Sequence, residues 1–134
     1  MPSEKFTPFH AQDIPNLSGY VAIVTGGNAG IGYETTFQLA LHGARVYIAG
    51  RSPDRVKKAI EQMKASSAKT LDLHMLEMDL QSLGSVKGGA ESFMRQESRL
   101  DLLINNAGVR SHPSTANKPS LHKVIKRKGK HQAR

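Results

Sequence analysis

The sequence predicts one α/β domain built on a doubly wound parallel sheet. Short apolar runs rich in β-branched residues alternate with stretches of helical periodicity from Tyr20 to Asn105. The runs lack an apolar/polar alternation, which is typical of strands that helices cover on both faces. A length of 134 residues allows one core and leaves little for a second. We therefore expect an extended lead-in over 1–19, a folded domain over 20–109 and a tail over 110–134.

Prolines, glycines and apolar spacing define the first part of the chain. Residues 1–19 are polar and rich in proline, so we expect them to be extended and outside the core. Residues 20–25 form a short β-branched run typical of a buried strand. Residues 30–42 follow a helical pattern, and Gly43 comes next as a helix stop.

The second strand and helix have the clearest boundary. Residues 44–49 are a second apolar run and predict a buried strand. Ser52, Pro53 and Asp54 then supply an N-cap, a proline for the first helical position and an acid in the first turn. We therefore expect a helix from Pro53 whose apolar face is formed by Val56, Ala59, Ile60 and Met63.

The last elements are less regular. Residues 70–80 alternate as a third strand should, although Leu76 and Met78 interrupt the period. Residues 82–97 predict a third helix despite three interior glycines, each of which costs about 1 kcal/mol relative to alanine. Residues 100–105 predict a fourth strand. Strands and helices that alternate in this way form parallel crossovers.

The charge is concentrated at one end of the chain. Of the 19 Lys and Arg residues, eight lie in 110–134, which contains no acid, and the net charge is +8. This composition predicts a disordered basic tail. A basic arm for nucleic acid or acidic membranes is an alternative, but no aromatic residue is interleaved with its charges, and we expect no nucleic-acid partner.

The composition also excludes several classes of chemistry. Without cysteine, the chain cannot form disulfides, Cys-ligated metal sites or a thiolate nucleophile. The six histidines have no metal-ligand spacing. No apolar run approaches the roughly 20 residues that span a bilayer, and the first residues lack the apolar core of a signal peptide. We expect a cytoplasmic protein without a membrane span.

A glycine-rich segment joins the first strand to the first helix, with the sequence Thr25-Gly26-Gly27-Asn28-Ala29-Gly30-Ile31-Gly32. In this position the helix presents unpaired N–H groups, and glycines allow a pyrophosphate to approach the backbone. A tight turn without a ligand is the alternative. The flanking strand and helix favour nucleotide binding.

Two motifs resemble the short-chain dehydrogenase/reductase family. They are the spacing Gly26, Gly30 and Gly32 after Thr25, and Asn105-Asn106-Ala107-Gly108 after the fourth strand. Residues 13–52 are similar to its retinol-dehydrogenase-like branch, which includes reductases of fungal secondary metabolism. The resemblance covers 13–109, the cofactor-binding half of the family's domain. It implies an incomplete Rossmann-type sheet of about four strands.

The resemblance also implies which residues contact a nicotinamide dinucleotide. The phosphates would lie against Gly26, Asn28, Gly30, Ile31 and Gly32. Adenine would contact Asp79 and Leu80, and the adenosine ribose and the centre of the sheet would involve Asn105, Asn106, Ala107 and Gly108. In isolation, Asp79 could instead be a helix cap and Asn105 a turn residue.

The end of the second strand predicts the choice of cofactor. An acid there would bind the two ribose hydroxyls of NAD, but the residues are Gly50 and Arg51. A guanidinium pairs well with a 2′-phosphate, so we expect NADP rather than NAD. A solvated Arg51, for which Asp54 competes, is the alternative.

The catalytic residues that the resemblance implies have no counterpart in this sequence. The family uses a Tyr, a Lys four positions later that lowers the pKa of the phenol, and an upstream Ser. The residues four positions after Tyr20, Tyr33 and Tyr47 are Val24, Phe37 and Arg51. We therefore expect a truncated NADP-dependent oxidoreductase of carbonyls or alcohols, or an inactive NADP-binding module. An incomplete sheet with an open edge would also favour oligomers and poor soluble expression.

Overall fold

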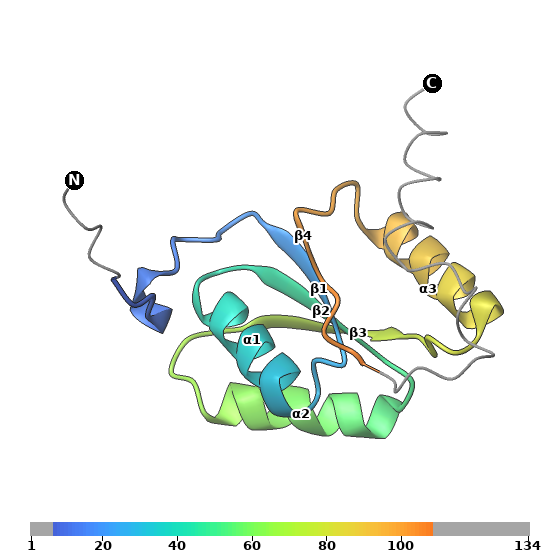
Figure 1. Cartoon of the computed structure of the whole chain (residues 1–134), viewed down its shortest axis with the longest axis horizontal. Coiled ribbons are helices and arrows are strands. Elements are labelled where there is room, and N and C mark those ends of the chain that lie inside the picture. Colours follow the sequence, from blue (N-terminus) through green and yellow to red (C-terminus); the bar gives the residue numbers. More distant parts are fainter. Residues whose placement is uncertain (1–6, 109–134) are drawn as a thin grey trace, which may run out of the picture.

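The computed structural model describes residues 7–108, which form a parallel sheet with helices on both faces (Figure 1). The elements are η1 (Ala11–Asp13), β1 (Val21–Thr25), α1 (Gly30–Leu41), β2 (Arg45–Gly50), α2 (Pro53–Ala65), β3 (Asp72–Glu77), α3 (Leu83–Gln96) and β4 (Leu102–Ile104). The strand order is β3-β2-β1-β4, and every pair is parallel. The predicted α/β class and four-stranded sheet are confirmed. The expected basic tail over 110–134 lies outside the described residues.

Two apolar clusters, one on each face of the sheet, hold the layers together. On one face, Val46 and Ile48 of β2 pack with residues of α1 and α2, including Ala40 and Val56. On the other face, Ile23, Tyr47 and Ala49 pack with α3. Every residue of β1 is buried. The central strands thus lie between two helical layers, as their uninterrupted apolar sequences predict.

Strand β3 alternates without interruption, contrary to the expectation that Leu76 and Met78 break its period. Leu73 joins the cluster beneath α1 and α2, while Leu76 and Met78 join the cluster beneath α3. The chain therefore presents apolar residues to both faces of the sheet in turn. The strand ends at Glu77, and the backbone N–H of Met78 bonds the carbonyl of Gly50 at 2.9 Å.

Part of the lead-in lies in the core, contrary to the expectation that residues 1–19 lie outside it. Leu17 is 7% exposed and belongs to the cluster that includes Ala40 and Ala44. Its N–H bonds the carbonyl of His42 at 2.7 Å, at the end of α1. Burial of this apolar side chain stabilises the fold, although the polar residues on either side of it are exposed.

Helix α3 tolerates its glycines for different reasons. A methyl group at Gly84 or Gly88 would meet no atom of the described residues within 4 Å, whereas one at Gly89 would overlap the methyl of Met78. Gly89 therefore allows the helix to approach the end of β3 closely. The buried face of Val86, Gly89, Ala90 and Phe93 and the Ser82 N-cap stabilise this helix.

Candidate functional site: a cleft at the carboxyl ends of the strands

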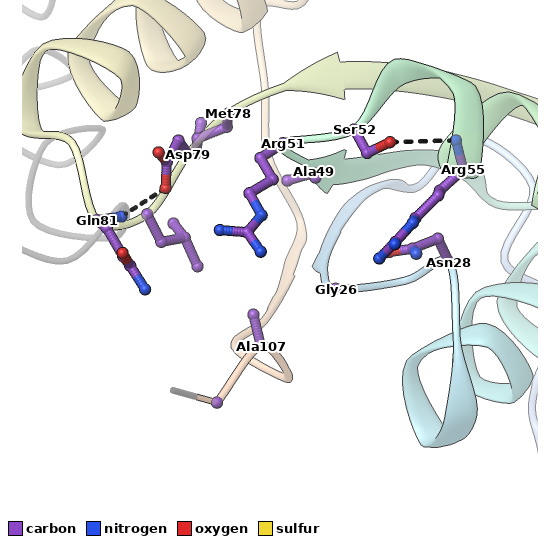
Figure 2. A pocket seen from close by; sticks show the side chains of 13 residues that line it. Gly26, Asn28, Ala49, Arg51, Ser52, Arg55, Met78, Asp79, Gln81 and Ala107 are labelled. Carbon is purple, nitrogen blue, oxygen red and sulfur yellow. Dashed lines mark hydrogen bonds between the residues drawn. The ribbon is translucent and has the colours of Figure 1, made fainter. Parts of the chain in front are cut away.

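A cleft of about 380 Å³ opens where the carboxyl ends of the strands meet. Four segments line it: Gly26 and Asn28 after β1; Ala49, Gly50, Arg51, Ser52 and Arg55 from the end of β2 into α2; Met78, Asp79, Leu80 and Gln81 after β3; and Ala107 and Gly108 after β4. This edge is where ligands bind in open parallel sheets. In Figure 2, Arg51 extends into the middle of the cleft between Asp79 on one side and Asn28 on the other.

The glycine turn brings bare backbone to this cleft. Gly26 and Gly30 have φ angles of 66° and 58°, a region that residues with a side chain rarely adopt. No atom of residues 7–108 lies within 4 Å of the position that a methyl group on Gly30 would occupy, so the backbone there is not covered by that part of the chain. At Gly32 a methyl group would overlap the carbonyl oxygen of Gly26. Glycines therefore keep the start of α1 accessible and close to the end of β1.

Hydrogen bonds tie the end of β1 to the segment after β4. The hydroxyl of Thr25, 1% exposed, accepts from the N–H of Ala107 at 3.0 Å. The same hydroxyl donates to the carbonyl of Ile104 at 3.4 Å. The side-chain amide of Asn106 donates to the carbonyl of Gly26 at 3.3 Å. The Asn-Asn-Ala-Gly segment is therefore held against the glycine turn.

The junction between β2 and α2 supplies positive charge. Arg51 follows the last residue of β2, and the hydroxyl of Ser52 caps α2 by accepting from the N–H of Arg55 at 3.5 Å. Arg51 forms no ion pair with Asp54, since the ion pairs among residues 7–108 involve other groups. Both guanidiniums are thus available to an anion in the cleft.

Asp79 shapes the opposite wall through a turn. Its N–H donates to the hydroxyl of Ser85 at 2.8 Å, and one carboxylate oxygen accepts from the N–H of Gln81 at 3.0 Å. The N-cap of α3 is Ser82, so the alternative of Asp79 as the helix cap is wrong. The turn places Leu80 beside the cleft.

The structure brings seven of the twelve proposed binding residues into the lining: Gly26, Asn28, Arg51, Asp79, Leu80, Ala107 and Gly108. The other five are Gly30, Ile31, Gly32, Asn105 and Asn106. Of these, Ile31 is 81% exposed at the start of α1, and Gly32 and Asn106 position the backbone around the turn. Sequence reasoning did not identify Arg55 and Gln81 as lining residues. Arg55 was detectable, because it lies in the first turn of the helix that follows Arg51.

A separate polar cluster lies at the other end of the sheet. The Arg45 guanidinium bonds Asp72 at 2.8 Å and Glu97 at 2.9 Å, and the Tyr47 hydroxyl donates to Glu97 at 2.8 Å. Burial and the hydrogen bond to Glu97 raise the pKa of Tyr47 to about 12. Burial alone would raise the pKa of Glu97, but its bonds from Arg45 and Tyr47 outweigh that effect and lower it. This cluster joins β2, β3 and α3 and is remote from the cleft.

Taken together, the doubly wound sheet, the glycine turn and the cleft define a Rossmann-type dinucleotide-binding domain. The sequence matches the family model for short chain dehydrogenases over residues 20–127. The chain belongs to the short-chain dehydrogenase/reductase family, whose members are oxidoreductases that use a nicotinamide dinucleotide.

Individual relatives agree with this family assignment. The chain is 47% identical over 100 residues to the short-chain dehydrogenase/reductase drtF of Aspergillus calidoustus, covering 75% of this chain and 32% of that protein. It is similar to a metagenomic short-chain oxidoreductase in complex with NADP, with 31% identity, a TM-score of 0.63, and coverage of 70% of this chain and 41% of the other. It is also similar to the Pseudomonas aeruginosa RhlG/NADP complex, with 33% identity and a TM-score of 0.63. That match covers 70% of this chain and 36% of the other.

The chain spans about a third of the length of the curated relatives that it matches. Its printed sequence contains no Tyr followed four positions later by Lys. Within the described range, no three His, Asp or Glu residues are grouped as metal ligands. No helix in residues 7–108 is long and apolar enough to cross a membrane. The expected division into lead-in, domain and tail at residues 19 and 109 stays a prediction.

Proposed function

We propose that this chain is the NADP-binding part of a short-chain dehydrogenase/reductase that interconverts a carbonyl compound and an alcohol. The observation that carries the preference for NADP is Arg51, which lies in the cleft after β2 and has no carboxylate partner within the described part of the chain. An acid at this edge would repel a 2′-phosphate, whereas a guanidinium binds one through two parallel hydrogen bonds. Two similar proteins, whose solved structures are complexes with NADP, support the same choice.

The residues of the cleft fit the chemical parts of such a cofactor. The bare backbone of Gly26 and Gly30 and the N-terminus of α1 suit a pyrophosphate. Arg51 would bind the 2′-phosphate, while Asp79 and Leu80 would flank adenine. Ala107 and Gly108, positioned by Thr25 and Asn106, would lie beside the ribose. Bound NADP supplies hydride transfer at its nicotinamide ring, and these residues bind and orient it.

In our proposal, this chain does not contain the residues that transfer the proton. The Tyr and Lys that the family resemblance requires have no counterpart among its 134 residues. A shortened form would therefore bind NADP without turnover, and a longer form would carry the catalytic groups. For the whole protein, the proposal is that it acts as a reductase in fungal secondary metabolism.

An inactive NADP-binding module is the second candidate. Strand β4 hydrogen-bonds β1 on one side and forms the end of the sheet on the other. An edge strand of this kind can pair with another chain. In that case the chain would bind NADP and contribute its edge to a partner.

Calorimetric titration of the full 134-residue chain with NADPH and NADH tests the proposed cofactor. We expect NADPH to bind at least about tenfold more tightly, because the 2′-phosphate adds charge-assisted hydrogen bonds. The variant Arg51→Ala should remove this preference while retaining weak binding of both nucleotides. Equal affinities in the unaltered chain would overturn the NADP assignment, and absence of binding would overturn nucleotide binding by this chain.

A further inference from the structure

The glycine turn, residues 26–32, packs against the side chain of Thr36 in the second turn of α1. We infer that Thr36 is a positioning residue for the proposed nucleotide site: its hydroxyl sets the depth at which the backbone of Gly27 packs on the sheet. This inference rests on the proposed function and deepens it. Thr36 is not a lining residue of the cleft, so it acts on the nucleotide through the glycine turn.

Space, and not backbone conformation, requires glycine at position 27. Two other glycines of the turn have positive φ angles, whereas Gly27 does not. A methyl group on Gly27 would lie 2.6 Å from Oγ1 of Thr36, which is too close for two atoms that are not bonded. It would also lie 3.1 Å from Cγ2 of Ile48 and 3.4 Å from Cβ of Val24. Gly27 is therefore packed where α1, β2 and β1 meet, and Thr36 occupies the space that a side chain would need.

The Thr36 hydroxyl is an unusual group to find in the core. The residue is fully buried, and its hydroxyl has no hydrogen-bond partner within residues 7–108. A buried hydroxyl without a partner lowers the stability of a fold, and an alanine at this position would avoid that cost. Such local exceptions are expected at functional sites. The close approach to Gly27 gives this hydroxyl a steric role that requires no hydrogen bond.

The position of Gly27 bears directly on the cleft. Its two neighbours in the chain, Gly26 and Asn28, both line the cleft, and Figure 2 shows the turn that connects them. Because the peptide bonds fix the distances between consecutive Cα atoms, a displacement of Gly27 moves both neighbours. The backbone N–H groups of such a turn bind a pyrophosphate only when they are within range and aligned. The depth of the turn therefore affects how well it binds the phosphates.

Two substitutions that compensate for one another test the contact, with calorimetric titration of the full chain with NADPH. Gly27→Ala should lower the affinity about tenfold or more, because its methyl group and the Thr36 hydroxyl cannot occupy the same space. The double variant Gly27→Ala/Thr36→Ala should recover most of this loss, since the methyl group takes part of the volume that the hydroxyl leaves. Two substitutions that damage the structure independently would add their losses instead.

Thr36→Ala alone tests the same contact without adding volume at the turn. It should weaken NADPH binding, because it leaves a space beneath Gly27 into which the backbone can shift. Thr36→Ser keeps the hydroxyl and should retain more of the affinity than Thr36→Ala does. Thr35→Ala and Gly88→Ala make the same chemical changes at positions outside this contact and outside the cleft lining, and should bind NADPH as the unaltered chain does.

Adenosine 2′-monophosphate distinguishes a change in the glycine turn from general damage to the site. This ligand carries adenosine and the 2′-phosphate but no pyrophosphate, so it has no group that would lie against the turn. Gly27→Ala should therefore lose affinity for NADPH and not for adenosine 2′-monophosphate. A similar loss for both ligands would mean that the whole site is disturbed, and would overturn the positioning role of Thr36.

Three further results would overturn this role while the unaltered chain still binds NADPH. They are full NADPH affinity in Gly27→Ala, full affinity in Thr36→Ala, and a double variant that binds no better than Gly27→Ala. The proposed function would stand in each case. An unaltered chain that binds neither NADPH nor adenosine 2′-monophosphate would instead refute the proposed function itself.

Discussion

The hydroxyl of Thr25 accepts a hydrogen bond from the backbone N–H of Ala107, which lies 82 residues further along the chain, at 3.0 Å. This bond connects the end of a central strand to the segment after the edge strand. The same hydroxyl also donates to the carbonyl of Ile104. One buried side chain therefore fixes the distance between two walls of the cleft.

Thr25→Val is expected to destabilise the fold by about 1–3 kcal/mol, because it leaves the N–H of Ala107 without its partner. Thr36→Val is the matched control, since the Thr36 hydroxyl is fully buried and has no hydrogen-bond partner among residues 7–108. That variant should be neutral or stabilising. Urea unfolding of both variants measures the difference, and equal effects would contradict the importance of the Thr25 bonds.

Gly32→Ala is expected to weaken NADPH binding by at least about tenfold, because the added methyl must displace Gly26 or Asn106 and reshape the phosphate turn. Gly88→Ala provides a control with the same chemical change in α3, where the added methyl would meet no atom of residues 7–108 within 4 Å. Titration with NADPH measures both. Unchanged affinity in Gly32→Ala would show that the close approach of α1 to β1 is not needed for binding.

The neighbouring glycines of α3 should respond oppositely to alanine. Gly88→Ala should stabilise the protein by about 0.5–1 kcal/mol, because alanine is the better helix former. Gly89→Ala should destabilise it by about 1–3 kcal/mol, since its methyl overlaps Met78 in the core. Thermal unfolding of the two variants checks this, and a stabilising Gly89→Ala would mean that Met78 moves aside freely.

The raised pKa of Tyr47 predicts a specific alkaline effect. A phenol with a pKa of about 12 in the folded state and about 10 when unfolded adds stability below pH 10 and loses it progressively as the pH rises to 12. Tyr47→Phe should therefore show a smaller decrease in the free energy of unfolding across this range. Absorbance titration of the phenolates supplies an independent measurement. If the phenol of Tyr47 ionised near pH 10 in the folded chain, its hydrogen bond to Glu97 would not persist in solution.

The open edge at β4 is expected to promote self-association of the chain. Leu102, Leu103 and Ile104 are each half-buried, and within residues 7–108 their strand is paired on one side, with β1. Pairing with another chain would bury this apolar surface and satisfy the free edge. Sedimentation over a range of protein concentrations measures the association. A monomer with ordinary stability at every concentration would refute this expectation.

Local signals in the sequence were sufficient to predict most of the fold. Ser52 and Pro53 begin α2 and Gly43 follows α1, because caps and stops act over a few residues. The burial of Leu17 was not predicted, since it depends on packing against a helix more than ten residues away. The apparent irregularity of β3 disappeared once its two faces were seen to lie against different helices.

The part of the candidate site that is formed by the backbone of the glycine turn could be predicted from the sequence. The part that depends on side chains from separate segments was harder to predict. The spacing of Gly26, Gly30 and Gly32 identifies the turn because each position has a steric requirement. The contributions of Arg55 and Gln81 depend on how the first turn of α2 and the turn after β3 face the same space. No periodicity in the sequence encodes that relationship.

The cleft is lined by segments from Gly26 to Gly108 that come together only when all four strands have paired. A ligand that binds in the cleft would therefore bind only the chain whose sheet is complete, and its binding would stabilise that folded state. A nucleotide at a hundredfold excess over its dissociation constant adds about 2.7 kcal/mol to the free energy of unfolding. If the cleft binds a nucleotide as proposed, the folded fraction of the chain depends on the concentration of that nucleotide as well as on the chain's own contacts.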